Sequence, residues 1–219
     1  MPDRDQWRAS LKMVAIFLLF FYSFYGAAAY LADYIGYKFD VGFEFEKHIP
    51  FIPAMATVYL TVGPMMLLSI FILRQTNAMR QLLRVLCAQT LIGFGIFLAF
   101  PVESNFPPQN SASLPAVYLF ADLINLKNNE LPSLHFCFAV TMALIYSHNR
   151  GPAIGILFHS WALAIGASTL LIHEHNLLDL LAGYLLAWSG ARWWKNATAT
   201  EKGPRPFAAD RQITNEAGG

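Results

Sequence analysis

Three stretches of the chain contain no Asp, Glu, Lys, Arg or His, and each is long enough to cross a lipid bilayer: residues 13–32, 49–73 and 85–102. A spanning helix needs about 20 mainly apolar residues. Three further apolar stretches are each interrupted by one ionisable residue: residues 131–147 by His135, 151–172 by His159 and 176–191 by Asp179. We therefore predict an all-α polytopic membrane protein, a bundle of six transmembrane helices that occupies residues 1–194.

The composition agrees with a membrane protein and excludes two other classes. Hydrophobic residues make up 56% of the 219 residues and charged residues 13%, whereas an ordinary soluble domain is about one quarter charged. A nucleic-acid-binding protein needs a basic surface to neutralise phosphates, and the net charge of +1 does not provide one.

The basic residues are distributed unevenly between the two sides of the predicted membrane. Six spans place both termini on one side, and twelve of the fifteen Lys and Arg residues lie on that side. The net charge is +7 there and −6 on the other side. Because cytoplasmic segments carry the excess of Lys and Arg, we predict cytoplasmic termini. We expect a bacterial inner-membrane protein whose loops 33–48, 103–130 and 173–175 face the periplasm.

Segments at the edges of the spans give three further expectations. The first span follows basic residues as a signal peptide does, but its apolar stretch is long for one, so we expect it to stay as an anchor. Residues 37–46 alternate apolar and polar with the period of a strand. We place this segment in the headgroup layer, with a lid over the site as the alternative. Residues 195–219 are polar and are predicted to form a disordered cytoplasmic tail.

Ionisable residues gather at the predicted outer edge of the membrane. His135 begins the fourth span, His175 lies in the turn before the sixth, and Asp179 follows one helical turn later. Residues four apart share a helix face, so Asp179 is expected to accept a hydrogen bond from one nitrogen of His175. The other nitrogen is then free to act as a nucleophile, with His135 as the acid, which makes these three the candidate catalytic residues.

The residues before His135 favour an anion. Pro132 and Ser133 are typical of the first turn of a helix. Unpaired backbone N–H groups at a helix start attract negative charge. The sequence thus favours an anion near His135.

These motifs resemble the type 2 phosphatidic acid phosphatase superfamily. The resemblance rests on Pro132-Ser133-Leu134-His135 and on Ser168-Thr169 followed by His175, Asp179 and Gly183. It implies a helical membrane bundle in which His135 protonates the leaving group, His175 attacks phosphorus and Asp179 orients His175. The superfamily's usual third motif has Arg in place of Thr169 and its second has Gly in place of Leu134. The first motif, a Lys and an Arg-Pro, has no clear match in this chain.

The absence of the superfamily's usual Lys and Arg residues from these motifs favours one of its branches. The substitutions look like those of inositol phosphorylceramide synthases, and residues 173–179 are similar to the last motif of sphingomyelin synthases, which are phosphotransferases. A phosphodiester carries one negative charge and needs fewer cations than a monoester does. We therefore predict headgroup phosphotransfer from a phosphodiester lipid, with hydrolysis of a lipid phosphate as the alternative. The predicted substrate-binding residues are Asn129, Ser133, Ser168, Thr169 and Lys127.

Other readings remain open at this stage. His and Asp residues also form the proton relays of transporters, and a silent relative that only binds lipid would carry the same spans. His135, His173, His175 and Asp179 could in principle bind zinc, but we predict no metal and no cofactor. Membrane lipids are the expected substrates, and the sequence implies neither a protein partner nor nucleic acid.

Overall fold

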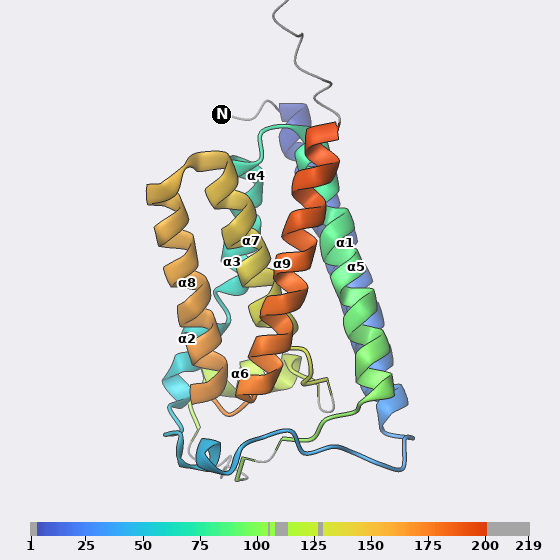
Figure 1. Cartoon of the computed structure of the whole chain (residues 1–219), viewed down its shortest axis with the longest axis vertical. Helices are drawn as coiled ribbons and strands as arrows, with labels where there is room; N and C mark the ends of the chain where they lie inside the picture. Colours follow the sequence, from blue (N-terminus) through green and yellow to red (C-terminus); the bar gives the residue numbers. More distant parts are fainter. Residues whose placement is uncertain (1–3, 105, 108–113, 127–128, 201–219) are drawn as a thin grey trace, which may run out of the picture.

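The fold is described from a computed structural model that covers residues 4–104, 106–107, 114–126 and 129–200 (Figure 1). Its elements are helical, and within these ranges no β-strand occurs, so the all-α prediction is confirmed. The elements are α1 (Arg4–Ala32), η1 (Glu44–His48), η2 (Pro53–Met55), α2 (Ala56–Tyr59), α3 (Val62–Leu67), α4 (Ser69–Ile72), α5 (Thr76–Ala99), α6 (Ala116–Ile124), α7 (Leu134–Arg150), α8 (Pro152–Leu171) and α9 (Leu177–Thr200).

Four helical segments are long and apolar enough to cross a membrane: α1, the stretch Pro53–Ile72, α5 and α8. The other two predicted spans correspond to α7, which has 17 residues, and α9, which carries Asp179, Arg192 and Lys195. The protein is therefore an integral membrane protein with four apolar candidate spans. Six crossings and the cytoplasmic position of the termini stay predictions.

α7 lies at the centre of the bundle. It packs against α8 and α9 and also contacts α3 and α4, while α1 packs along α5 and α5 packs on α9. Eleven residues of α7 are buried, as expected of a helix that is apolar on every face. Gln89 on α5 donates to the Thr141 hydroxyl of α7 at 2.8 Å and to the Leu186 carbonyl of α9 at 3.3 Å. Such polar contacts join helices in an apolar medium.

The segment Pro53–Ile72 is a broken helix rather than the continuous span predicted over residues 49–73. Pro64 has no N–H to donate and its ring crowds the preceding turn, and the helix is interrupted at Leu60 and Thr61. Neighbouring helices satisfy backbone groups along the segment: Tyr146 donates to the Met65 carbonyl at 3.0 Å and Arg150 donates to the Phe71 carbonyl at 2.8 Å. Irregular backbone at membrane depth requires such partners.

The loop over residues 33–48 is not a strand. It makes one isolated bridge, between Phe39 and Val102, and then the short helix η1. Its aromatic side chains are nevertheless exposed, as the headgroup-layer prediction expects: Tyr37, Phe39, Phe43 and Phe45. The second loop contains the helix α6, which the sequence analysis did not predict. α6 buries Tyr118 and Ala121.

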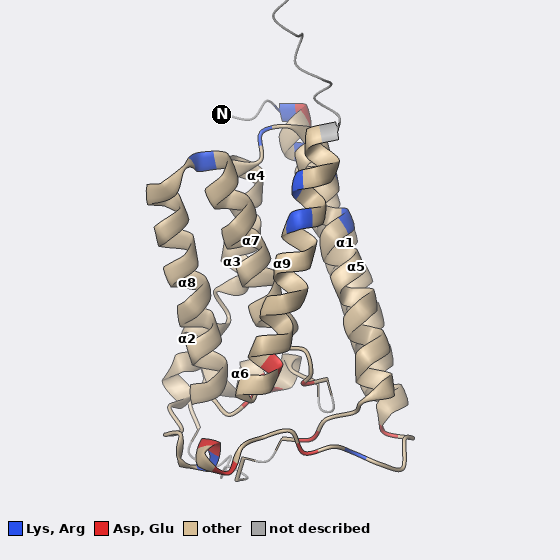
Figure 2. Ribbon diagram, viewed as in Figure 1, with Lys and Arg blue, Asp and Glu red and all other residues tan. Residues whose placement is uncertain are grey.

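Charged residues separate toward the two ends of the bundle (Figure 2). We call the end that carries Arg4, Arg74, Arg150 and Lys195 the basic end, and the end that carries Glu46, Glu103, Glu130 and Glu174 the acidic end. α1 begins and α9 ends at the basic end (Figure 1). α9 continues to Thr200, so the predicted tail boundary at residue 195 lies inside a helix. The remainder of that tail, residues 201–219, lies outside the described residues.

Candidate active site

Ser133 caps α7 and so fixes the position of His135 in the first turn. The Ser133 hydroxyl accepts the N–H of Phe136 at 3.4 Å, the usual role of a serine before a helix. His135 is half-buried and its ring lies 4.1 Å from that of Tyr59, centroid to centroid, on the short helix α2. The Tyr59 hydroxyl is 3.1 Å from His135 Nδ1. This contact occupies Nδ1 and leaves Nε2 to face a substrate.

The turn between α8 and α9 contains two histidines, His173 and His175. His173 adopts a positive φ of 61°, its Nε2 lies 3.0 Å from the Ile49 carbonyl, and its ring stacks on Phe106 at 4.2 Å. The backbone N–H of Glu174 donates to the Thr169 carbonyl at 3.0 Å. His173 therefore shapes this turn, and burial lowers its pKa below the ordinary value, which favours the neutral ring.

His175 and Asp179 lie together in the interior. His175 is 2% exposed and Asp179 is fully buried, and His175 Nδ1 is 3.6 Å from Asp179 Oδ2. This distance exceeds that of a normal N–H···O hydrogen bond, so the structure shows a close approach rather than the hydrogen bond that was predicted. Bonds between catalytic groups are often long before substrate binds.

Asp179 also joins α7, which carries His135, to α9, which follows His175. Its Oδ2 accepts the backbone N–H of Asn176 at 2.8 Å, and its backbone carbonyl accepts the N–H of Ser133 at 3.0 Å. A Cβ added at Gly183 would lie 2.7 Å from the Ser133 carbonyl oxygen. The first turn of α9 thus contacts the first turn of α7 backbone to backbone, and this contact brings His135 and His175 to the same end of the bundle.

Glu46 is a site residue that the sequence analysis missed. It is fully buried, its Oε1 accepts the backbone N–H of Leu177 at 2.6 Å, and its Oε2 accepts the N–H of Phe43 at 2.5 Å. A carboxylate at the start of α9 also interacts favourably with the helix dipole. Glu46 therefore attaches the loop of residues 33–48 to the helix that follows His175. Nothing in the sequence distinguishes it from Asp40 and Glu44, the other acidic residues of the same alternating segment.

A network of hydrogen-bonded side chains lies at the acidic end of the bundle. Tyr25 donates to the Asn125 side chain at 2.7 Å, and Asn125 donates in turn to Glu174. Asn129 donates to the Tyr25 carbonyl at 2.8 Å. Burial raises the pKa of Glu174 to about 6, against the effect of the Asn125 hydrogen bond. Burial, and next the Asp179 carboxylate, raises the pKa of Glu130 to about 9, so Glu130 is protonated at neutral pH.

Several buried polar atoms at this end have no hydrogen-bond partner within the part of the chain that the structure describes: Asn129 Oδ1, Glu130 Oε2, His175 Nδ1, both side-chain atoms of Asn176, and Asp179 Oδ1. Native proteins leave few such atoms unsatisfied, and those that remain require an explanation. Their convergence around His175 is the pattern expected where a polar ligand binds.

The predicted substrate-binding residues occupy different surroundings. Asn129 and Ser133 are buried beside the start of α7. Ser168 and Thr169 are fully buried, and their hydroxyls donate to the carbonyls of Ile165 at 2.6 Å and Gly166 at 2.8 Å. A hydroxyl has one donor hydrogen, so in this conformation neither residue has a proton to offer a phosphate. Their substrate-binding role stays a prediction, and Lys127 lies outside the described residues.

No group of three His, Cys, Asp or Glu side chains within the described ranges is arranged to bind a metal ion. At the acidic end, the Lys and Arg residues that the structure describes are Lys38 and Lys47. Lys47 pairs with Glu44 at 2.8 Å on the surface. The described side chains of this end therefore offer little positive charge to a phosphate.

The bundle and the site define an integral membrane protein with a buried histidine–aspartate pair at one end. A family model described as the PAP2 superfamily matches residues 34–193, which include all three candidate catalytic residues. The chain belongs to the PAP2 superfamily, which assigns it to the broad class of enzymes that act as phosphatases or phosphotransferases on lipid phosphates. No curated protein and no solved structure matches the chain. The superfamily resemblance is confirmed, and the synthase-like branch stays a prediction.

The raised pKa of Glu130 predicts an unusual pH dependence of stability. The folded-state pKa of about 9 lies above the ordinary 4.5, so the stability that this group contributes is complete below about pH 4.5 and is lost as the pH rises through about 9. Glu130→Gln keeps the neutral form. We expect it to raise the Tm relative to the wild type by an amount that is small at pH 5 and reaches the equivalent of a few kcal/mol at pH 8. Melting curves in detergent, with exposed Glu103→Gln as the control, measure this difference. A Tm difference that does not change with pH contradicts the assignment.

Proposed function

We propose that the protein transfers a phosphoryl-bearing headgroup between lipids at the acidic end of the bundle, through a phosphohistidine intermediate on His175. The observation that carries the proposal is the buried pairing of His175 with Asp179, 3.6 Å apart. Asp179 lies on α9, which is joined to the start of the His135 helix by the Ser133 to Asp179 backbone bond. This arrangement supplies a nucleophile, the group that orients it and an acid within one site.

The proposed reaction proceeds in two displacements. His175 Nε2 attacks the phosphorus of the donor lipid, the bond from phosphorus to the leaving alcohol oxygen breaks, and His135 Nε2 donates its proton to that oxygen. His135 then accepts the proton of an acceptor hydroxyl, whose oxygen attacks phosphorus as the bond to His175 breaks. Imidazole stays neutral after losing its Nε2 proton only if Nδ1 keeps its own, so His135 acts as the imidazolium in the first displacement and as neutral imidazole in the second. In both states its Nδ1–H donates to the Tyr59 hydroxyl oxygen, 3.1 Å away.

The charges around the site support a phosphodiester donor. Glu46, Asp179 and Glu174 are buried or nearly so at this end, and Lys47 is engaged with Glu44. A monoester dianion would face these carboxylates without the arginine clamp that usually binds phosphate. A diester carries half that charge. With a monoester donor and water as the acceptor, the same residues would act as a lipid phosphatase, which is the alternative that family membership also supports.

We expect the purified enzyme to turn over phosphatidylethanolamine or phosphatidylcholine at least tenfold faster than phosphatidic acid in the same detergent. Neutral hydrogen bonds, about half as strong as charge-assisted ones, suffice for a monoanion but bind a dianion poorly. The assay follows headgroup transfer to ceramide or a long-chain alcohol against release of free phosphate, with His175→Ala as the blank. Faster release of phosphate from monoesters would make the phosphatase the better assignment. No turnover of any lipid would favour a transporter or a silent lipid-binding relative.

A further inference from the structure

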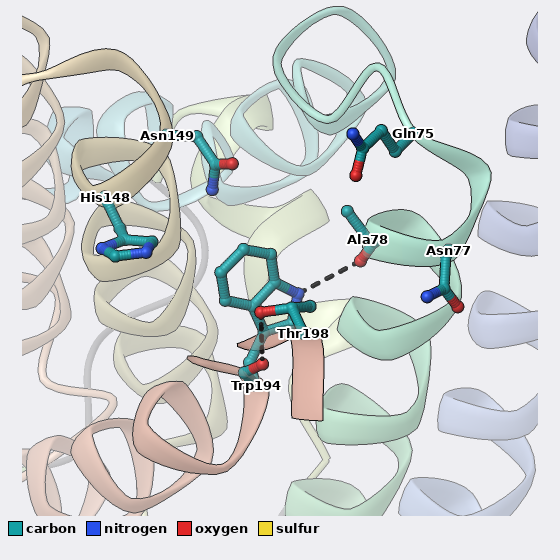
Figure 3. A pocket seen from close by; sticks show the side chains of 7 residues that line it. All are labelled: Gln75, Asn77, Ala78, His148, Asn149, Trp194 and Thr198. Atoms are coloured by element: carbon teal, nitrogen blue, oxygen red, sulfur yellow. Dashed lines mark hydrogen bonds between the residues drawn. The ribbon is translucent and has the colours of Figure 1, made fainter. Parts of the chain in front are cut away.

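Two hollows lie at the basic end of the bundle, far from the histidines. One, of about 480 Å³, is drawn in Figure 3 and is lined by Gln75, Asn77, Ala78, His148, Asn149, Trp194 and Thr198. The second, of about 280 Å³, lies between α7 and α9 and shares His148 and Trp194 with the first. Thirteen residues of α7 separate His135 from His148, which is about 20 Å of helix. Neither hollow is therefore part of the candidate active site.

The buried side chain of Trp194 lines both hollows and lies between them. It is 3% exposed, and its indole N–H donates to the Ala78 carbonyl of α5 at 3.1 Å (Figure 3). The hollow in Figure 3 has no Lys or Arg in its lining. The hollow on the other side of Trp194 has two, Arg192 and Lys195, so the positive charge lies on that side.

The hollow between α7 and α9 changes from apolar to basic along its length. Both helices run toward the basic end, so Leu144 and Trp188 lie deeper in the bundle than His148 and Lys195 (Figure 1). Residues three and four apart lie on one helix face, which places Trp188, Arg192 and Lys195 in line along α9. The Arg192 guanidinium lies 4.7 Å from the centre of the Trp188 ring, a contact that holds its planar head in position. This gradient matches an acyl chain followed by a phosphate headgroup.

From these contacts we propose that the hollow between α7 and α9 binds an anionic glycerophospholipid of the leaflet at the basic end. The headgroup phosphate contacts Arg192 and Lys195 beside His148, and the start of an acyl chain lies along Leu144, Ala191 and Trp188. Basic pockets between membrane helices bind anionic lipid headgroups in this way. The site is separate from the proposed reaction, so its occupancy does not depend on turnover.

The test is native mass spectrometry of the purified chain with dioleoyl phosphatidylglycerol or dioleoyl phosphatidylcholine. We expect the wild type to retain phosphatidylglycerol preferentially, and Arg192→Gln with Lys195→Gln to bind it about tenfold or more weakly, since each cation near the surface contributes to anionic-lipid binding. The matched control is Arg80→Gln with Arg84→Gln, which removes the same charge from α5 outside the hollow. This control should bind as the wild type does.

A third variant, Ala191→Phe, fills the hollow and keeps both cations, and it should also lose the lipid. Thermal melting in neutral detergent shows whether Ala191→Phe folds. If it does not, the variant with both Arg192→Gln and Lys195→Gln decides the test alone. Equal retention of the two lipids, or equal loss in the target and control pairs, would overturn the proposal. Displacement of phosphatidylglycerol by millimolar inorganic phosphate would show an ion site rather than a lipid site and would overturn it too.

Discussion

His175→Ala is expected to abolish turnover while the protein still folds. The proposed intermediate forms on this imidazole, and alanine has no nucleophilic group to replace it. The control is His159→Ala, because His159 lies within α8 and its Nδ1 contacts the Gly155 carbonyl of its own helix at 2.7 Å. Turnover per mole of folded protein should be lost in the first variant and kept in the second. Wild-type activity in His175→Ala would exclude a phosphohistidine on this residue.

Asp179→Asn is expected to lower the rate by roughly 10²- to 10⁴-fold, as occurs when the partner that orients a catalytic imidazole loses its charge. The amide oxygen can still accept the N–H of Asn176, so the start of α9 should keep its shape and the Tm should change little. His135→Ala should be nearly as inactive with lipid esters but much less so with a nitrophenyl ester, since a good leaving group needs little protonation. An equal loss on both esters would remove His135 from the role of acid.

Gly183→Ala is expected to reduce both stability and turnover, although alanine is normally the better helix former. A Cβ at this position would lie 2.7 Å from the Ser133 carbonyl oxygen, which is backbone and cannot swing away. The first turns of α7 and α9 must then separate, and the Ser133 to Asp179 bond that aligns the histidines weakens. Overpacking of this kind costs about 1–3 kcal/mol, and small shifts in reacting groups cost about 10²-fold in rate.

Gly95→Ala is the matched control for Gly183→Ala. Gly95 is also inside a long helix, α5, but an added Cβ there meets nothing within 4 Å. This variant should melt at or above the wild-type temperature, because alanine is favoured over glycine in a helix by about 1 kcal/mol. The comparison uses Tm and turnover in one detergent. Identical behaviour of the two variants would show that the close contact between α7 and α9 does not position the site.

The sequence predicted the helices that depend on apolar length and the site residues that depend on spacing. Residues 13–32 lie within α1, residues 85–99 of the predicted span 85–102 lie within α5, and His135 lies in the first turn of α7. Pro132 and Ser133 were predicted in the first turn, but the helix begins at Leu134 and Ser133 is its cap, because several polar residues near a helix start each satisfy the pattern of a cap and only the backbone path distinguishes them. Hydropathy also could not locate the interruption at Leu60, since prolines are tolerated in membrane helices when neighbours supply partners.

Tyr59 and Glu46 could not be predicted from local pattern. Tyr59 lies within an apolar run where an aromatic residue is unremarkable, and it reaches His135 on α7 because α2 packs beside α8, which itself packs on α7. Glu46 lies in an alternating segment where a carboxylate reads as surface, yet it is buried against the start of α9. Both contacts join residues far apart in the chain, and such contacts are set by packing rather than by the identity of near neighbours.

The number of long helices between His135 and His175 decides whether the two histidines lie at the same end of the bundle. His135 lies in the first turn of α7 and His175 lies two residues before α9, and the starts of two helices fall at the same end only when an odd number of long segments lies between them. α8, with 20 residues, rises about 30 Å, the thickness of the hydrocarbon layer, and is that single segment. The lipid-facing side chains of α8 can therefore vary widely without disturbing the proposed reaction, whereas removing or duplicating this one helix would place the proposed nucleophile and the proposed acid at opposite ends of the bundle.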